Sequence, residues 1–232
     1  MIVPTEQALS MSMAAADAMG RAQQGAAEAE AELRILTPLL KLRACRDNIT
    51  VATGAMEVRG GNGYIEDWVN PRLVRDAHVG LLWEGTSNIN ALDVIQRAVG
   101  KAGGHRALQA MLRRRLGNAS PLPGEFRNQL EQTLDRAVSL AEQVANTGAE
   151  PQARRAATAL YDAASAVLLA WEGSRPGADA RRVLLARMVL DHRLSPQDPL
   201  EIEDAAGEDA AIDLLLDETP LTLDRVAPLL AG

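Results

Sequence analysis

The side chains best suited to chemistry lie in two short segments, residues 57–64 and 83–88. The first segment places Gly60, Gly61 and Gly63 within four positions, so that its backbone can approach a ligand closely and adopt positive φ angles. The second presents the carboxylate of Glu84 at a turn beside Gly85. A carboxylate held in this way can act as a general base. The two segments predict a ligand-binding and proton-abstracting site.

These segments belong to a longer pattern, from about residue 31 to 96, that resembles acyl-CoA dehydrogenases. These are flavin enzymes that remove a proton from Cα and a hydride from Cβ of an acyl-CoA thioester. The Trp-Glu-Gly turn, the Thr-Pro on the preceding helix and the Leu-Asp-Val exit resemble the alkylation-response (AidB-like) branch most. The motifs are Thr-Pro-Leu-Leu-Lys at 37–41, Gly-Gly-Asn-Gly-Tyr at 60–64, Trp-Glu-Gly-Thr-Ser-Asn-Ile at 83–89 and Leu-Asp-Val at 92–94.

The resemblance implies a role for each site residue. Glu84 would be the catalytic base, and Trp83 and Gly85 would line the acyl pocket. Glu57 stands where many relatives carry Gln, and it brings a negative charge toward a phosphate. The residues implied to contact the flavin dinucleotide, in part that of a neighbouring subunit, are Glu57, Gly60, Gly61, Thr86 and Asn88.

Each of these residues also has a purely structural interpretation. Glu84 could be an ordinary surface residue of a turn, the glycines a helix C-terminus, and Thr86 or Ser87 an N-cap. Trp83 fits a packed core equally well. Both interpretations stay open at the level of the sequence.

Other chemistries have little support in the sequence. His78, His105 and His192 show no metal-ligand spacing with one another or with a cysteine, so we expect no metal site. No phosphate-binding loop, nucleophile elbow or zinc signature is present. Arg75 with Asp76 is expected to form an ion pair or to anchor a loop.

The composition predicts an all-α protein. The chain of 232 residues is 47% hydrophobic but only 3% aromatic, and Ala and Leu favour helices. Its single cysteine, Cys45, cannot form an internal disulfide, and we expect it to be a reduced core thiol in a cytoplasmic protein. No stretch reaches the roughly 20 apolar residues of a membrane span. The net charge of −7 disfavours a broad nucleic-acid surface.

The apolar spacing and the breakers predict two helical modules. Residues 1–100 would form the helical bundle of the acyl-CoA dehydrogenase C-terminal type, and residues 101–232 a helical extension with an acidic tail. Pro38 should kink the long second helix, and Pro71 should lie in a polar loop at 64–72. The expected helices are 4–24, 26–58, 73–82 and 88–99, then 106–116, 125–146, 151–171 and 178–190.

Two functions follow. In the first, the chain is the C-terminal α-domain of a flavin-dependent acyl-CoA dehydrogenase and is inactive alone, because we find no counterpart of the N-terminal and middle β-domains that cover the flavin adenine dinucleotide (FAD). The alternative is a non-catalytic module for oligomerisation or for DNA or protein binding. Its support is a basic group made of Lys101, Arg106, Arg113, Arg114, Arg115, Arg127, Arg154 and Arg155. Both predict a homodimer or homotetramer through apolar faces of the long helices, and we expect neither nucleic acid nor a membrane as partner.

Overall fold

The computed structural model describes residues 1–195, 200 and 206–230, and within these ranges every regular element is a helix. This confirms the predicted all-α class. Those ranges contain no helix of the length and apolarity that crossing a membrane would require. Four of the acidic residues in the predicted tail, Asp198, Glu201, Glu203 and Asp204, lie outside the described residues.

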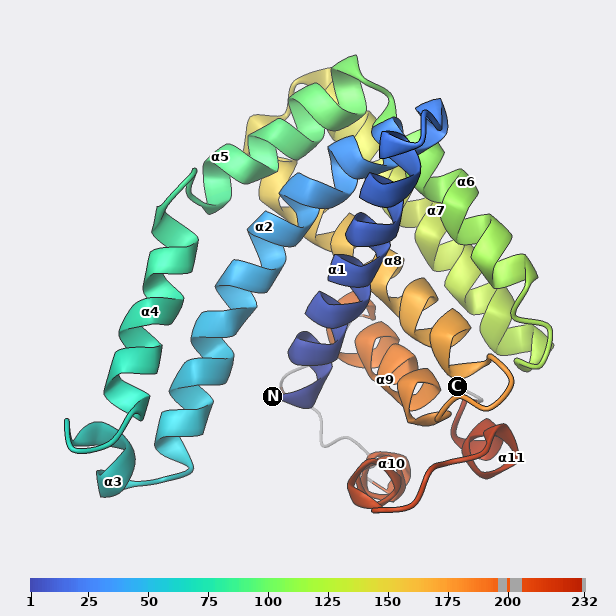
Figure 1. Cartoon of the computed structure of the whole chain (residues 1–232). Coiled ribbons are helices and arrows are strands. Elements are labelled where there is room, and N and C mark those ends of the chain that lie inside the picture. The colour runs from blue at the N-terminus through green and yellow to red at the C-terminus, as the bar shows by residue number, and fades with distance from the viewer. Residues whose placement is uncertain (196–199, 201–205, 231–232) are drawn as a thin grey trace.

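Two long antiparallel helices begin the chain, α1 (Ile2–Gln23) and α2 (Ala27–Glu57), joined by a tight turn at Gly25 with φ of 89°. Only glycine enters that backbone region without strain. Pro38 lies inside α2, and the helix continues past it without a break. The two helices pack against each other near this turn and diverge farther from it (Figure 1).

The second half of α2 leaves the rest of the molecule and pairs with α4 (Asn70–Leu82) to form an arm, closed at its tip by the short helix α3 (Gly61–Tyr64). Figure 1 shows this arm standing apart from the other helices. Pro71 was expected in the loop, but it lies in the first turn of α4. Proline suits that turn because its missing N–H would have no intrahelical partner there.

A sharp turn after α4 leads to α5 (Ser87–Leu92), which runs directly into the π-helical segment η1 (Asp93–Lys101). This pair returns the chain from the arm to the body of the protein. The wider π-helical turn leaves Val94, Ile95, Ala98 and Val99 buried against the body.

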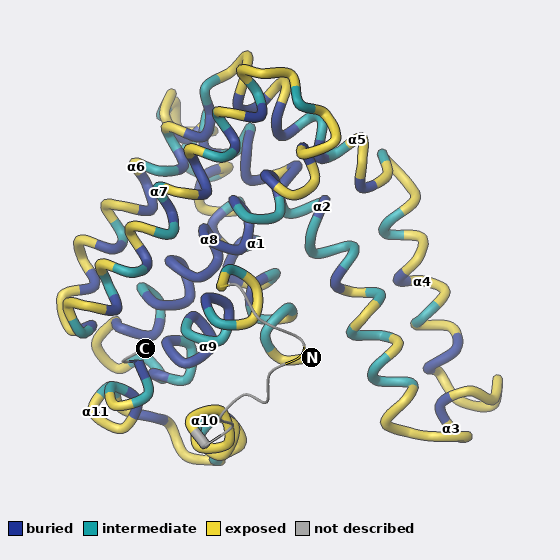
Figure 2. Tube along the Cα trace, turned by 180° about the vertical axis from the view of Figure 1, so that it is seen from behind, coloured by how far each residue is buried: buried dark blue, intermediate teal, exposed yellow. Residues whose placement is uncertain are grey.

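The body is built from the helices that follow. Leu160, Tyr161, Val167 and most other residues of α8 are buried, so this helix forms the centre of the molecule, whereas the arm is largely exposed (Figure 2). The elements are α6 (Gly104–Gly117), α7 (Gly124–Thr147), η2 (Glu150–Gln152), α8 (Ala153–Gly173), α9 (Arg181–Val189) and η3 (Leu190–Leu194).

The C-terminal residues form three short helices, α10 (Ala206–Leu216), α11 (Leu223–Val226) and η4 (Ala227–Leu229). They dock on the body because Leu221, Val226 and Leu230 are buried. Arg181 of α9 donates to the carbonyl oxygen of Thr219 at 3.2 Å. The described part of the tail is therefore largely helical and docked on the body.

One apolar core joins the two halves of the sequence, from Met11 on α1 to Leu230 near the C-terminus. Polar contacts also cross between the halves. The side-chain amide of Gln7 donates to Asp162 at 3.0 Å and to Ser165 at 2.8 Å, and all three residues are buried. The extension is therefore packed against the first hundred residues. The boundary near residue 100 remains a prediction about family domains.

Candidate functional site

The turn between α4 and α5 holds the predicted base in an uncommon conformation. Glu84 has a φ of 54°, and among the described residues it is the only one other than glycine with a positive φ. Its neighbour Gly85 has a φ of 101°, and a Cβ there would lie 3.4 Å from the side chains of Ile89 and Asn90. Left-handed backbone at a non-glycine residue costs about 1–2 kcal/mol. Such strain persists where the surroundings impose it, and it is frequent at functional sites.

Side chains from α2 and α5 fix this turn. The ammonium group of Lys41 on α2 donates to the carbonyl oxygen of Gly80 at 2.6 Å and lies 5.8 Å from the centre of the Trp83 ring. On the other flank, the amide of Asn90 donates to the carbonyl oxygens of Gly85 and Thr86 at 2.7 and 3.0 Å. The strained turn is thus held from two sides.

Glu84 lines a depression of about 560 Å³ formed mainly by the first half of α2. Leu33 and Pro38 contribute apolar wall to it. At its far side Arg34 makes a two-pronged ion pair with Asp93, with both nitrogen–oxygen distances 2.9 Å. The Glu84 side chain is solvent-exposed. An exposed carboxylate beside an apolar depression can accept a proton from a molecule seated there once that molecule excludes water.

Trp83 does not line this depression. Its side chain is 61% exposed, so the interpretation as a core tryptophan is wrong. It contacts Lys41 instead, and its assignment to the acyl pocket stays a prediction.

Thr86 and Asn88 lie on a second depression, of about 250 Å³, where they are joined by two arginines. Arg46 of α2 donates to the buried hydroxyl of Ser87 at 3.2 Å, and Arg154 comes from the start of α8. Thr86 occupies the N-cap position of α5, but its side chain makes no capping hydrogen bond. The hydroxyl, the amide and two guanidinium groups form a set that suits phosphate oxygens.

The glycine segment lies at the other end of the arm. The helix α4 separates it from Glu84, and 13 residues at about 1.5 Å each make this roughly 20 Å. Glu57, Gly60 and Gly61 are all exposed at the tip. The structure therefore does not bring the two motifs together within one copy of the chain.

The glycines of this segment differ in what requires them. Gly60 has a φ of 56°, and a Cβ at Gly63 would lie 2.1 Å from the carbonyl oxygen of Met56. Fold geometry accounts for both. Gly61 has neither a positive φ nor any neighbouring atom within 4 Å of the place of a Cβ. Nothing in the described part of the chain requires glycine at this position.

The loop between α3 and α4 is tied down by Arg75, which pairs with Glu66 at 2.8 Å. The adjacent guanidinium lowers the pKa of Glu66. The expected ion pair of Arg75 with Asp76 does not form. Asp76 instead lies 4.0 Å from Arg72, which is one helical turn earlier on α4. Arg75 is therefore the loop anchor, which was the other expected role.

The basic run on α6 is neutralised inside the chain. Arg113 pairs with Asp135 at 2.7 Å, Arg114 with Glu32 at 3.2 Å and Arg115 with Asp17 at 3.4 Å. These carboxylates belong to α7, α2 and α1, so the three guanidinium groups do not form one free stripe. A nucleic-acid surface needs such a stripe.

The remaining candidates are structural. His105 is buried and hydrogen-bonded to Glu142 at 2.7 Å, and His78 contacts the carbonyl oxygen of Val74 at 2.8 Å. Within the described ranges no cluster of histidine, cysteine or carboxylate side chains could hold a metal ion. Cys45 is a free thiol, half-buried instead of lying fully in the core.

Three supporting residues were not predicted as part of the site: Lys41, Asn90 and Arg154. Lys41 ends the Thr-Pro-Leu-Leu-Lys motif, which gave a signal for it. Asn90 lies just after the Trp-Glu-Gly-Thr turn, within reach of its carbonyl groups. Arg154 lies far along the chain from Thr86, and only the packing of α8 beside α5 brings it to this depression.

Comparison with known proteins gives one consistent picture for the first part of the chain. Residues 1–100 match the family model described as "Acyl-CoA dehydrogenase, C-terminal domain". Acyl-CoA dehydrogenase family member 11 of Caenorhabditis elegans is 37% identical over 120 residues, which are 51% of this chain and 19% of that protein. The putative acyl-CoA dehydrogenase AidB of Escherichia coli K12 is 40% identical over 88 residues, 37% of this chain and 16% of that protein.

A solved structure extends the similarity beyond the matched hundred residues. The crystal structure of Caenorhabditis elegans ACDH-11 in complex with C11-CoA superposes on 94% of this chain with a TM-score of 0.72 and 25% sequence identity. The aligned part is 39% of that chain. The chain thus spans a fifth or less of the two relatives found by sequence and well under half of the solved structure.

Proposed function

We propose that the chain, whose first hundred residues match the C-terminal domain of acyl-CoA dehydrogenases, supplies the helical half of a site for α,β-dehydrogenation of an acyl-CoA thioester. The family is flavin-dependent. The observation that carries the proposal is the strained Glu84 turn beside an apolar depression on α2.

Glu84 would remove the proton from Cα of the thioester. The positive φ at Glu84 projects the residue from a turn that Lys41 and Asn90 hold in place. An acyl chain seated in the depression would displace water from the carboxylate and strengthen its interactions with the reacting atoms. FAD, when bound, supplies the acceptor for the hydride from Cβ.

The residues around Thr86 fit the nucleotide half of FAD. The Thr86 hydroxyl is not used for capping, Asn88 offers an amide, and Arg46 and Arg154 add positive charge on the same depression. These groups would hold phosphate oxygens. The assignment of Trp83 and Gly85 to the acyl pocket stays a prediction, since neither residue lines the Glu84 depression.

The glycine segment would serve a second copy of the chain. Gly60 and Gly61 are exposed roughly 20 Å from Glu84, and none of the described residues requires glycine at position 61. A flavin bound to a neighbouring subunit gives a reason for backbone approach at this point. Glu57 would lie near the same flavin, where its charge opposes phosphate.

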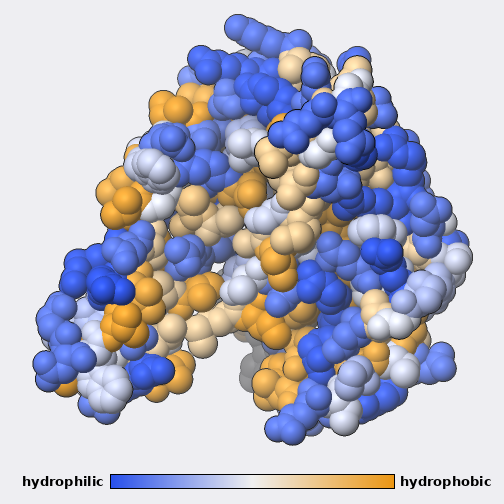
Figure 3. Space-filling view, viewed as in Figure 1, coloured by the Kyte–Doolittle hydropathy of each residue, from blue (hydrophilic) through white to orange (hydrophobic). Residues whose placement is uncertain are grey.

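Self-association has independent support from the surface. Leu9, Met13 and Met19 on α1 are 44%, 59% and 49% exposed, and Figure 3 shows further hydrophobic side chains on the arm and along the notch beside it. Apolar surface of this kind is typical of subunit interfaces. We therefore propose a homodimer or homotetramer.

By itself the chain would neither bind FAD tightly nor oxidise a thioester, because both depressions are open to solvent and Glu84 is exposed. The test is a titration with FAD, followed by the quenching of its fluorescence, and then an assay with acyl-CoA and an electron acceptor. The assay is repeated with a polypeptide that carries the N-terminal and middle domains of a relative. Activity should arise only in the mixture and vanish in Glu84→Gln.

Two outcomes would contradict this proposal. Stoichiometric, tight FAD binding by the chain alone would show a complete cofactor site and overturn the half-site. Activity that survives in Glu84→Gln would remove the proposed base. The alternative is a non-catalytic nucleic-acid or protein-binding module. Three members of its basic group, Arg113, Arg114 and Arg115, do not support it, because they are paired with carboxylates of this chain.

A further inference from the structure

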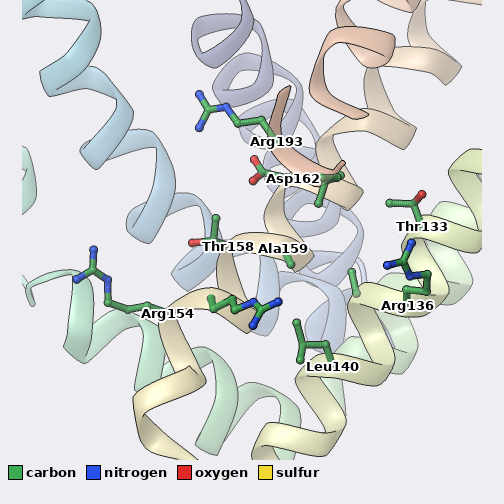
Figure 4. A pocket seen from close by; sticks show the side chains of 11 residues that line it. Thr133, Arg136, Leu140, Arg154, Thr158, Ala159, Asp162 and Arg193 are labelled. Atoms are coloured by element: carbon green, nitrogen blue, oxygen red, sulfur yellow. The ribbon is translucent and has the colours of Figure 1, made fainter. Parts of the chain in front are cut away.

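A cavity of about 620 Å³ lies between α7, the first part of α8 and η3. All the residues that line it follow residue 100, so it lies outside the segment matched by the family model. Glu84 and the first half of α2 do not contribute to it. Figure 4 shows the side chains that surround it.

Four arginines line this cavity, Arg136 from α7, Arg154 and Arg155 from α8 and Arg193 from η3. A single carboxylate, that of Asp162, accompanies them. The chain as a whole has a net charge of −7, so the cavity is a local excess of positive charge on an acidic protein. Clefts lined by one sign of charge concentrate ions of the opposite sign.

Most of these guanidinium groups have no partner among the residues that the structure describes. Arg193 lies 3.7 Å from Asp47, but Arg136, Arg154 and Arg155 make no hydrogen bond or ion pair with any other described residue. Elsewhere on the molecule arginines are generally paired, as Arg113, Arg114 and Arg115 are on α6. The unpaired groups gather around one recess.

The local backbone adds to the positive field. Arg154 and Arg155 stand in the first turn of α8, a helix of 21 residues that has no acidic residue there. The N-terminal end of a helix carries partial positive charge, so cations are unfavourable at this end and anions are stabilised. The nearby Glu150 accepts a hydrogen bond from Gln96 at 2.7 Å. A bound anion would relieve this repulsion.

The floor of the cavity is less polar than its rim. Ala137, Leu140, Ala159 and Leu194 provide apolar surface, and Thr133 and Thr158 add hydroxyl groups. The volume is far larger than one phosphate needs and lies within the range of small-molecule sites, about 300–1,000 Å³. The shape therefore suits an anionic group attached to a compact body.

We propose that this cavity binds a phosphorylated small molecule of about mononucleotide size, with its phosphates on Arg136, Arg155 and Arg193 and its less polar body over Leu140 and Ala159. Arginine suits this role because its planar fork pairs with two phosphate oxygens at once. A nucleic-acid strand fits less well, because its backbone needs cations along a line, and here they surround one recess. The proposal does not rest on acyl-CoA dehydrogenase activity.

The test uses the full chain, titrated calorimetrically at low salt with adenosine diphosphate, inorganic pyrophosphate and adenosine. Arg154 also lines the depression at Thr86, so it is left unchanged. The double variant Arg136→Gln, Arg155→Gln should weaken adenosine diphosphate binding at least about tenfold, since each removed contact is charge-assisted. The charge-matched control Lys101→Gln, Arg127→Gln should bind as the unchanged chain does. The variant Thr86→Val reports any binding at the Thr86 depression instead.

Each other outcome overturns the proposal. An equal loss in the charge-matched control would mean that adenosine diphosphate follows general surface charge. A loss in Thr86→Val alone would place its binding at the other depression. Adenosine binding as tightly as its diphosphate would remove the role of phosphate. Absence of binding by both the diphosphate and pyrophosphate would exclude the phosphorylated small molecule.

Discussion

The ammonium group of Lys41, midway along α2, donates a hydrogen bond to the carbonyl oxygen of Gly80, 39 residues later, at 2.6 Å. This contact ties the last turn of α4 to α2 directly before the Glu84 turn. The position of the predicted base therefore depends on a side chain of another helix. The same ammonium group also lies over the Trp83 ring, so Lys41 contacts both Gly80 and Trp83.

Replacement of Lys41 by Met should loosen this turn, because it removes the charge-assisted hydrogen bond and the contact with Trp83 while keeping an apolar stem. We expect a loss of about 1–2 kcal/mol in the free energy of unfolding and greater exposure of Trp83. Denaturant unfolding and the accessibility of Trp83 fluorescence to a quencher measure these effects. The variant Lys101→Met, at an exposed position, is the control. Unchanged quenching of Trp83 would contradict the anchoring role.

Glu84 should be held in its left-handed conformation at the expense of stability. Glycine adopts a φ of 54° without a Cβ clash, so Glu84→Gly should be more stable than Glu84→Gln by about 1 kcal/mol. Thermal unfolding of the two variants side by side gives the difference. If Glu84→Gln were the more stable variant, the backbone of this turn would not be strained.

Gly61 and Gly63 form a matched pair for the tip of the arm. Gly63→Ala places a Cβ 2.1 Å from the carbonyl oxygen of Met56, and this should cost about 2 kcal/mol or more because backbone has to move. Gly61→Ala meets open space and should change stability by less than about 0.5 kcal/mol. Chemical denaturation tests both variants. A large destabilisation by Gly61→Ala would show that the fold itself requires this glycine.

The exposed face of α1 should mediate self-association. The double variant Leu9→Glu, Met13→Glu places two charges on this face. The two side chains are 44% and 59% exposed, so the fold should remain intact. The oligomer should dissociate, because the charges interrupt the apolar surface. Light scattering over a concentration series gives the mass, and circular dichroism checks the helices. A monomeric mass for the unchanged chain at every concentration would eliminate this interface.

Helix α1 also shows which features of the fold could be predicted from the sequence and which could not. Its bounds were predicted within two residues, because Pro4 and the apolar spacing mark them. The apolar face formed by Leu9, Met13 and Met19 is nevertheless the exposed one, and the opposite face is buried with Gln7 and Ser10 in it. The side-chain nitrogen of Gln7 donates to Asp162 and Ser165, more than 150 residues away. A single sequence gives no sign of such distant partners.

The candidate sites differ in the same way in whether the sequence alone could identify them. The Glu84 turn lies within one continuous motif, so residue types and spacing were enough to identify it. The arginine-lined cavity combines Arg136, Arg155 and Arg193, which come from three separate elements. Only the packing of α7, α8 and η3 brings them together. The unexpected entry of Arg154 into the Thr86 depression has the same cause.

Asp162 should make the stability of the protein depend on pH in a direction opposite to that of most carboxylates. Burial raises the pKa of its carboxyl group to about 6, although Arg43 and Arg193 favour the charged form. Asp47 opposes ionisation, and Gln7 donates a hydrogen bond to the carboxylate. Between about pH 4 and pH 6, Asp162 therefore keeps its proton in the folded chain, whereas the unfolded chain, with a pKa near 3.8, has already released it.

Stability from this group is consequently present at acidic pH and is lost as the pH rises from about 4 through about 6. Asp162→Asn keeps an acceptor for Gln7 and cannot ionise, so its stability relative to the unchanged chain should improve between pH 4 and pH 7 by at most about 3 kcal/mol. Unfolding of both proteins across this range gives the difference, and other titrating groups cancel in it. A difference that stays constant with pH would show that Asp162 ionises in the folded chain as it does in the unfolded one.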